Sequence, residues 1–361
     1  MDLVMVGAGE AARKHWIEGI IRTPRVNVVA VVDQDIAKAR RVATMFSGKV
    51  PVFRSAHAAI PPLPSNPVAL VLTPDHFPTI VDLVKRGWQR LIVEKPLVSR
   101  DDEIAALKKL MADNPAVKIF AVDQYIAKTV TLQCLTGLLS RSDPRGRFLK
   151  TLHQSHFSAT RGLLGSVEGV SIAVVESGGF CLPDLAKRSW LRNDPEIGGM
   201  LRDLGTHAFA PLIAAGIITS AAEVRLVHLT KLDDDSSLLP VLSPREVEMH
   251  VFAMLRENGV PVTASFGKVP GEGGIWALTV RFKNGEYRAG LRSGQPAVVA
   301  LNDGYVASET LSVSPVEYLI HEAKLFFNGD LPGFDGNIGA VLGSLEICAR
   351  IREKYFADMR R

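Results

Sequence analysis

The sequence predicts an α/β protein with two domains: an N-terminal doubly wound parallel sheet, and a C-terminal α+β domain built on a large, mainly antiparallel open sheet. In the first 125 residues, short continuous apolar runs alternate with segments of helical period, which is typical of a parallel sheet covered on both faces. From residue 223 to about 310, strand patterns dominate instead. The length of 361 residues also suits two hydrophobic cores better than one. We therefore expect one domain over 1–125 and a second over 126–361.

The predicted elements of the first domain follow one another closely. Helical spacing covers 11–21, 36–46 and 80–86. Ser99, with Asp102 three residues later, has the form of a capping box and predicts the start of a further helix. The apolar strand runs that alternate with these helices are Leu3–Val6, Val26–Val32, Val68–Leu72, Leu91–Val93 and Val117–Val122.

The second domain shows the period of half-buried strands. Over 276–283, large apolar residues occupy every second position. Asn258-Gly259 and Asn284-Gly285 are strong hairpin turn signals. The remaining expected elements are helices at 129–139, 203–215, 315–328 and 337–356, and strands at 148–158, 247–255 and 260–266.

Composition excludes several classes of protein. Hydrophobic residues make up 47% and charged residues 22%, and a net charge of +4 without a dense basic run argues against nucleic-acid binding. No apolar run is long enough to predict a membrane span or a signal peptide, so we expect a cytoplasmic protein. His153 and His156 are three apart in an expected strand and hence on opposite faces, which argues against a shared metal. We likewise expect no disulfide and no metal site from the three widely spaced cysteines, Cys134, Cys181 and Cys348.

A dinucleotide fingerprint lies between the first expected strand and the first expected helix. Residues 7–12 fit the pattern G-x-G-x-x-A. In a Rossmann domain, Gly7 would permit the tight turn, Gly9 would let the backbone approach a pyrophosphate, and Ala12 would let the helix pack close to the strand. Asp33 ends the second strand, where a carboxylate accepts hydrogen bonds from the adenosine ribose and repels a 2′-phosphate. The expected cofactor is therefore NAD, with NADP as the alternative.

Three further segments carry a family resemblance over essentially the whole chain. They are Glu94-Lys95-Pro96, the stretch 190–195 running into Gly198-Gly199, and the D-x-G-x-H pattern at 203–207. In this order they resemble the glucose-fructose oxidoreductase, inositol dehydrogenase and rhizopine-catabolism (Gfo/Idh/MocA) family. The resemblance implies hydride transfer between nicotinamide and a sugar, cyclitol or related small molecule. It also implies a homodimer or homotetramer that associates through the C-terminal sheet.

The resemblance implies roles for individual residues. Lys95 would lie near the reacting hydroxyl, and Asp203 and His207 would line the other side of the site. Histidine titrates near neutrality, so His207 can accept or donate the hydroxyl proton, while Asp203 would orient the imidazole or bind a substrate hydroxyl. Asp203 and His207 would share a helix face if Asp203 already lies in the first turn of that helix. Besides the fingerprint residues, the expected cofactor-binding residues are Thr73, Pro74, Glu94, Lys95 and Pro96.

The sequence departs from the family pattern at two places. The pattern usually continues D-x-G-x-H-x-x-D, but the last position here is Ala210, so one substrate-facing carboxylate is missing. The family often has a histidine a few residues after the T-P at the end of the fourth strand, where this chain has Pro78. His76 lies nearby, and the sequence leaves open whether it substitutes.

An additional segment points to an anionic substrate group. Residues 123–128 resemble the D-H-Y-L-G-K segment of glucose-6-phosphate dehydrogenases, with Gln124 in place of the histidine. The resemblance implies that Lys128 contacts an anionic group and that Tyr125 supplies a hydroxyl. Arg192, in the loop before the D-x-G-x-H pattern, is a further candidate for the same role. The competing interpretation of 123–128 is a strand end followed by a helix start.

Two alternative functions stay open at this point. Some relatives in the family oxidise, eliminate and re-reduce in one cycle, so a redox-neutral glycosidase or lyase that retains NAD is one of them. The other is a non-catalytic nucleotide-sensing protein, which the missing acid at Ala210 would permit. The presence of Lys95, Asp203 and His207 argues against a non-catalytic protein, because nucleotide binding alone does not need all three residues.

Overall fold

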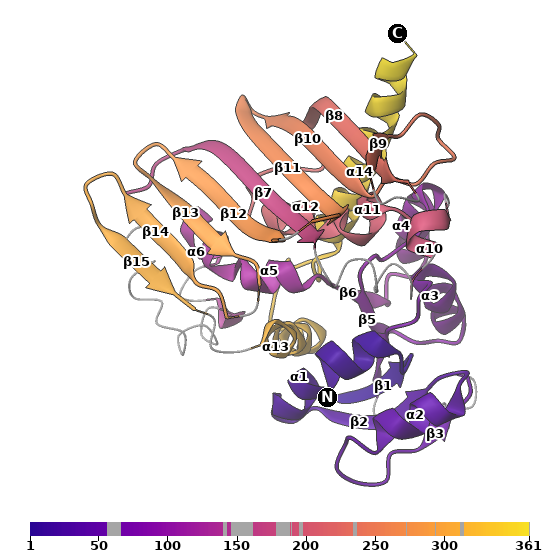
Figure 1. Cartoon of the computed structure of the whole chain (residues 1–361). Helices are drawn as coiled ribbons and strands as arrows, with labels where there is room; N and C mark the ends of the chain where they lie inside the picture. The colour runs from indigo at the N-terminus through magenta and orange to yellow at the C-terminus, as the bar shows by residue number, and fades with distance from the viewer. Residues whose placement is uncertain are drawn as a thin grey trace. The chain divides into compact units, whose positions relative to one another are not determined.

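The computed structural model divides into two units (Figure 1). The first comprises Met1–Ala127 and Val313–Gly339, and the second comprises Lys128–Ser312 and Ala340–Arg361. The structure describes residues 1–55, 66–139, 143–145, 162–177, 188, 190–194, 198–233, 237–271, 273–292, 294–310 and 314–360.

A six-stranded sheet forms the centre of the first unit. Its order is β3-β2-β1-β4-β5-β6, and every neighbouring pair is parallel. The chain reverses its direction of winding between β1 and β4, which is the place where doubly wound sheets bind ligands. The Rossmann prediction is confirmed. The strands are β1 (Asp2–Val6), β2 (Asn27–Val32), β3 (Val52–Phe53), β4 (Val68–Val71), β5 (Arg90–Glu94) and β6 (Lys118–Val122).

The helices of this unit differ from expectation at three starts, and the largest difference is in α3, which begins at His76 where the sequence predicts a start at residue 80. The first helical segment opens as a π-helix, η1, before α1 continues it. The capping-box prediction at Ser99 is wrong: α4 starts after Arg100, and the Glu103 carboxylate accepts the backbone N–H groups of Ser99 and Arg100. Glutamate reaches back over a full turn, which the shorter Asp102 cannot do. The helices are η1 (Ala12–Trp16), α1 (Ile17–Arg22), α2 (Ile36–Ala43), α3 (His76–Lys85), α4 (Asp101–Asp113), α5 (Gln124–Lys128) and α13 (Pro315–Asn328).

A nine-stranded open sheet dominates the second unit and confirms the predicted C-terminal architecture. The order is β15-β14-β13-β12-β7-β11-β10-β8-β9. Only the β7–β11 pair is parallel, and the other neighbouring pairs are antiparallel. The strands are β7 (Val167–Ser177), β8 (Glu223–Leu232), β9 (Leu238–Pro240), β10 (His250–Glu257), β11 (Val260–Val269), β12 (Ile275–Phe282), β13 (Gly285–Gly290), β14 (Ala297–Leu301) and β15 (Val306–Glu309).

The two predicted hairpins both form, with one difference in the turn. Asn258 and Gly259 have φ of 48° and 86° and connect β10 to β11 as predicted. In the next hairpin Phe282 pairs with Gly285, so the turn consists of Lys283 and Asn284. Gly285 belongs to β13 instead, where an added Cβ would collide with the Ala300 carbonyl of the next strand.

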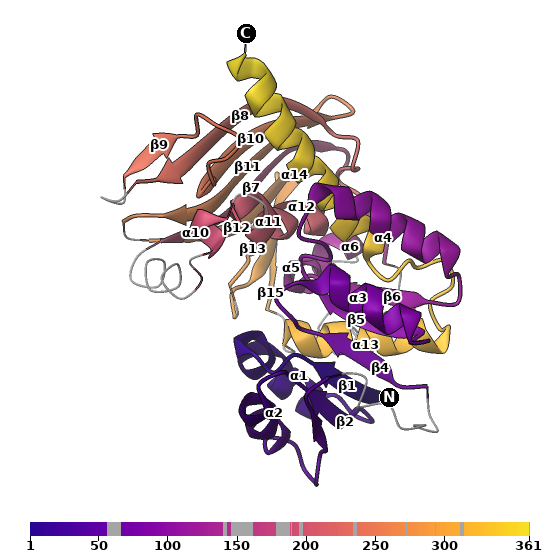
Figure 2. The ribbon, with the colours of Figure 1, turned by 90° about the vertical axis from the view of Figure 1, so that its right-hand side faces the viewer.

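Helices α11, α12 and α14 cover one face of this sheet (Figure 2). Phe209 of α12 packs edge-on against Phe266 of β11, with ring centroids 5.8 Å apart. The single helix expected at 203–215 is two helices, because the chain is interrupted at Leu204. The helices are α6 (Val130–Thr136), α10 (Trp190–Asn193), α11 (Met200–Asp203), α12 (Gly205–Ala214) and α14 (Ile338–Met359).

Some predictions fall where nothing is described. The expected strand at 148–158, with His153 and His156, and Cys181 lie outside the described residues. Within the described ranges, no helix is both long enough and apolar enough to span a bilayer.

Candidate functional site

The loop between β1 and η1 uses its two glycines for different reasons. Gly7 has φ of 107°, and an added Cβ would lie 2.8 Å from the carbonyl carbon of Leu72. Gly7 is therefore required by the fold itself. At Gly9 an added Cβ would meet no atom within 4 Å, so open space lies in front of this residue. Ala12 is fully buried at the start of η1, as the fingerprint requires.

Asp33 ties the end of β2 to this loop. One of its carboxylate oxygens accepts the N–H of Ala8 at 2.7 Å, and the other accepts the N–H of Asp35 at 2.8 Å. Each carboxylate oxygen can accept a second hydrogen bond, so capacity remains for ribose hydroxyls. Open space at Gly9 and a fixed acid beside Ala8 fit the pyrophosphate and ribose of a dinucleotide.

Thr73 and Pro74 lie between β4 and α3, next to the same edge of the sheet. The Thr73 hydroxyl donates to the Asp75 carbonyl at 3.1 Å and lies 3.0 Å from the Thr79 hydroxyl. Pro74 is exposed. This loop is thus held by its own side chains before α3 begins at His76.

His76 is linked to the E-K-P segment, which sequence reasoning left open. The peptide bond between Lys95 and Pro96 is cis, and His76 Nδ1 lies 2.5 Å from the Pro96 carbonyl oxygen. Because a carbonyl only accepts, Nδ1 carries the proton and Nε2 is the bare acceptor. Burial lowers the pKa of His76 to about 4, with the Lys95 ammonium adding to the effect. His76 is therefore neutral at physiological pH and holds the segment that carries Lys95.

Glu94 occupies an environment that favours its protonated form. Burial raises the pKa of Glu94 to about 7, and Asp123 raises it further, against the opposing effects of Lys95 and Trp16. The Trp16 indole N–H donates to the Glu94 carboxylate at 3.4 Å. Glu94 thereby connects the end of β5 to η1.

The segment after β6 is compatible with a strand end followed by a helix start. Asp123 is fully buried, and one of its carboxylate oxygens accepts the N–H of Tyr125 at 2.8 Å. Tyr125 is itself 2% exposed. In the second unit, the Lys128 ammonium donates to the Leu291 carbonyl at 2.5 Å.

Asp203 stands in a cluster of charged side chains in the second unit. It ends α11, 10% exposed, and its carboxylate lies 3.6 Å from the Arg188 guanidinium and 3.9 Å from the Lys268 ammonium. Lys268 is fully buried and also pairs with Glu176. His207 is buried in α12, so the condition that both residues share the first turn of one helix is not met.

A buried ion pair holds the start of α11 in place. The Glu248 carboxylate accepts the Leu201 N–H at 3.1 Å and pairs with Arg352 of α14 at 2.7 Å. Gly199, with φ of 90°, precedes this turn, and an added Cβ there would collide with the Glu248 carboxylate. Burial raises the pKa of Glu248, which the neighbouring Arg352 opposes.

The sequence profile of the Gfo/Idh/MocA family, described as an oxidoreductase family with an NAD-binding Rossmann fold, matches residues 1–124. Residues 1–124 are thus similar to the NAD-binding Rossmann domain of this family. No curated protein matches the chain in sequence.

Solved structures share the fold over almost the whole chain. One is the 3-ketoreductase KijD10 from Actinomadura kijaniata with NADP and TDP-benzene, which is 15% identical, has a TM-score of 0.66, and aligns over 97% of this chain and 95% of its own. Another is an oxidoreductase from Agrobacterium radiobacter with NAD+, L-tartaric acid and magnesium, which is 13% identical, has a TM-score of 0.67, and aligns over 96% of this chain and 94% of its own.

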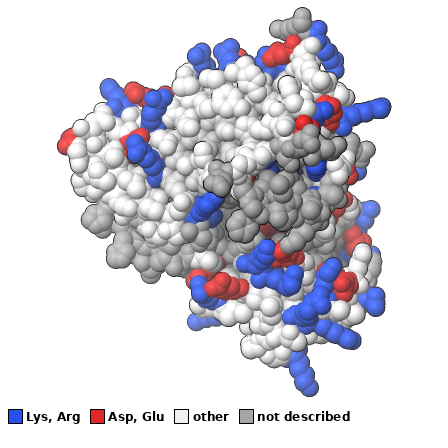
Figure 3. Space-filling model, viewed as in Figure 1, with Lys and Arg blue, Asp and Glu red and all other residues white. Residues whose placement is uncertain are grey.

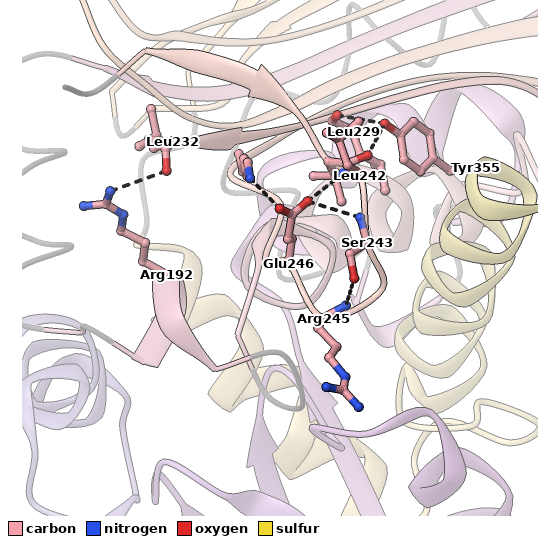
Figure 4. A network of polar contacts seen from close by, with 10 residues as sticks. Arg192, Leu229, Leu232, Leu242, Ser243, Arg245, Glu246 and Tyr355 are labelled. Atoms are coloured by element: carbon pink, nitrogen blue, oxygen red, sulfur yellow. Dashed lines mark hydrogen bonds and ion pairs between the residues drawn. The ribbon is translucent and has the colours of Figure 1, made fainter. Parts of the chain in front are cut away.

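The Arg192 side chain makes polar contacts within the second unit (Figure 4). Its guanidinium donates to the Asp233 carbonyl at 2.7 Å and to the Leu232 carbonyl at 3.4 Å. In the same region Glu246 accepts the N–H groups of Leu242 and Ser243. Binding of an anionic group by Arg192 therefore stays a prediction. The guanidinium would have to bind this group while it also donates to the carbonyls of Leu232 and Asp233.

Sequence reasoning missed three members of the Asp203 cluster, Arg188, Lys268 and Glu176. Val262, Ala264 and Phe266 alternate toward the helices, and Lys268 continues that inward series. A lysine at a position that the strand period assigns to the core was the available signal. Glu176 had no such signal, because the strand that carries it was not predicted.

Proposed function

We propose that this chain is an NAD(P)-dependent oxidoreductase that transfers hydride between nicotinamide and a hydroxyl or keto carbon of a sugar, cyclitol or related small molecule. The observation that supports this proposal best is the loop after β1. Open space lies in front of Gly9, and the Asp33 carboxylate holds the loop by accepting the N–H of Ala8. This loop lies at the reversal point of the parallel sheet. The first unit would bind the cofactor, and the second the substrate.

The residues of the first unit fit a nicotinamide dinucleotide. Gly9 would face the pyrophosphate, while Gly7 shapes the turn and the buried Ala12 lets η1 pack close to β1. Asp33 would contact the adenosine ribose, and the loops after β4 and β5 the remainder. A bound nicotinamide would supply the carbon that gives or takes hydride. Asp33 favours NAD, because its carboxylate would repel a 2′-phosphate.

The protein side chains would manage the proton. Lys95 would hold the substrate oxygen, its segment fixed by the His76 contact to Pro96. His207 would accept the hydroxyl proton in oxidation or return it in reduction. Asp203 would contact the substrate, and Tyr125, Lys128 and Arg192 are the proposed contacts of an anionic group.

Turnover of a substrate panel tests the function. The purified protein is mixed with NAD or NADP and a set of polyols, sugars and hydroxy acids, and with the reduced cofactors and keto sugars, while absorbance of the reduced nicotinamide is followed. Bound cofactor without any hydride transfer across the panel would contradict the proposal.

Lys95→Met is expected to reduce kcat/KM by about a hundredfold, because a positioned proton-handling group contributes that much. The dissociation constant for NAD should change much less than kcat/KM, because Lys95 is one of several expected cofactor contacts and the loop after β1 is untouched. Lys85→Met, on α3, is the matched control and should keep full activity. An unchanged kcat/KM in Lys95→Met would show that Lys95 takes no part in the reaction.

Asp33→Ser is expected to shift cofactor preference toward NADP by about tenfold or more in the ratio of kcat/KM values, because the charge that repels a 2′-phosphate is removed. Serine retains an acceptor for the Ala8 N–H. The measurement is the rate with each cofactor at one substrate concentration. If the variant kept the cofactor preference of the wild type, Asp33 would not discriminate between the ribose of NAD and that of NADP.

We also propose that the chain forms a homo-oligomer through the open sheet. The face opposite α12 carries few charged side chains (Figure 3). Met254 and Leu226 are paired on neighbouring strands there and are 37% and 40% exposed. A second copy would cover this apolar surface. Sedimentation velocity at micromolar concentration tests this proposal of a homo-oligomer, and a monomeric protein would contradict it.

A further inference from the structure

Lys268 occupies a position that a strand normally gives to an apolar residue. It follows Phe266 in the inward series of β11, and its side chain has no exposed surface. A buried ammonium is costly unless it is paired. Lys268 pairs with Glu176, its register partner on β7, and its ammonium is 3.9 Å from the Asp203 carboxylate.

Glu176 alone would suffice to neutralise Lys268. The same ammonium nevertheless approaches the carboxylate at the end of α11, which the Arg188 guanidinium approaches from the other oxygen at 3.6 Å. Asp203 is thus flanked by two cations. Both favour its ionised form over its protonated form.

We propose that Lys268 is a positioning residue that keeps Asp203 ionised and oriented as a hydrogen-bond acceptor for a substrate hydroxyl. This inference rests on the proposed function and extends it. It assigns Asp203 the role of acceptor and leaves proton transfer to His207 and Lys95. The preferred substrate would therefore present a hydroxyl group, and no carboxylate or phosphate, to Asp203.

The charges of the cluster support this substrate class. Among the described side chains, the cations Lys268 and Arg188 are balanced by the carboxylates Glu176 and Asp203. Within these four side chains the charges cancel, so the two pairs leave no surplus positive charge of their own for an anionic substrate group. The other ionisable groups close to α11 and the elements packed on it are His207, Arg202, Glu248 and Arg352.

A purely structural ion pair, which only fastens α11 to the sheet, is the competing explanation. Lys268→Met alone would leave the Glu176 carboxylate, which is 30% exposed, without this partner and would change the net charge of the cluster. The test therefore uses Lys268→Met combined with Glu176→Gln, which removes one charge of each sign. The matched control is Arg225→Met with Glu223→Gln, an exposed ion pair of 2.7 Å on β8.

The first measurement needs no substrate. Carboxyl carbons of aspartate are labelled with 13C and titrated by NMR in the wild type, the double variant and the control, with Asp203→Asn identifying the signal. Loss of the Lys268 charge, 3.9 Å from Asp203, should raise the midpoint of the Asp203 titration in the double variant, by less than about one pH unit because the Glu176 charge is removed with it. An unmoved midpoint would overturn the proposal.

The second measurement is the pH profile of kcat/KM with a substrate found in the panel. The acid limb should move up by about the same amount in the double variant and stay in place in the control. A moved NMR midpoint with an unmoved acid limb would reduce Lys268 to a structural role. A wild type without hydride transfer would contradict the proposed function instead, while the NMR titration would still decide the link between Lys268 and Asp203.

Discussion

Gly9→Val is expected to abolish NAD binding and leave the folded protein intact. No atom lies within 4 Å of the position that a Cβ would take at Gly9, so the Cβ of valine lies in open space. The free energy of unfolding should change by less than about 1 kcal/mol. The side chain would fill the space that the proposed pyrophosphate needs, so titration calorimetry with NADH should give no measurable heat.

Gly7→Ala is the informative contrast to this variant. Its φ of 107° is unfavourable for alanine, and the new methyl group would lie 2.8 Å from backbone atoms of Leu72. Backbone cannot move aside as a side chain can, so we expect a loss of about 2–4 kcal/mol in the free energy of unfolding. Urea unfolding measures both variants. Equal destabilisation by both, or NADH binding by Gly9→Val, would contradict the division of roles between the two glycines.

The sequence could predict such roles because they depend on local pattern. A strand, a glycine turn and a helix occupy one continuous stretch, and each of the five apolar runs of the first domain marks a real strand. Asp33 could be placed by the same reasoning, since it directly follows β2. Apolar runs and turn signals are properties of neighbouring residues, so no knowledge of distant contacts is needed.

The unpredicted features depend on contacts between distant segments. Strand β7 lies between β11 and β12 at the centre of the nine-stranded sheet, yet its sequence VEGVSIAVVES mixes small, polar and apolar residues. The interruption at Leu204 has no glycine or proline of its own. The contact of His76 with Pro96 joins two loops 20 residues apart. A contact of this kind can be predicted only when the order of the strands in the sheet is known.

The contact of His76 with Pro96 and the burial of Glu94 have opposite consequences for stability as pH changes. His76 has its pKa lowered from 6.5 to about 4 in the folded state, so the unfolded chain binds more protons between these values and stability rises with pH. Glu94 has its pKa raised from 4.5 to about 7, so the folded chain binds more protons and stability falls as pH rises. Each contribution amounts to about 3 kcal/mol. Between about pH 4.5 and 6.5 the two nearly cancel.

Single substitutions should therefore uncover two opposite slopes in the cofactor-free protein. In Glu94→Gln the contribution of Glu94, which falls with pH, is absent, so stability relative to wild type rises by about 3 kcal/mol from pH 4.5 to 7. In His76→Asn, whose amide can still donate to Pro96, the contribution of His76, which rises with pH, is absent, so relative stability falls by about the same amount from pH 4 to 6.5. Urea unfolding at several pH values gives both differences, and all other titrating groups cancel in the comparison. If the free energy of unfolding depended on pH in the same way in all three proteins, the shifted pKa values of His76 and Glu94 would be contradicted.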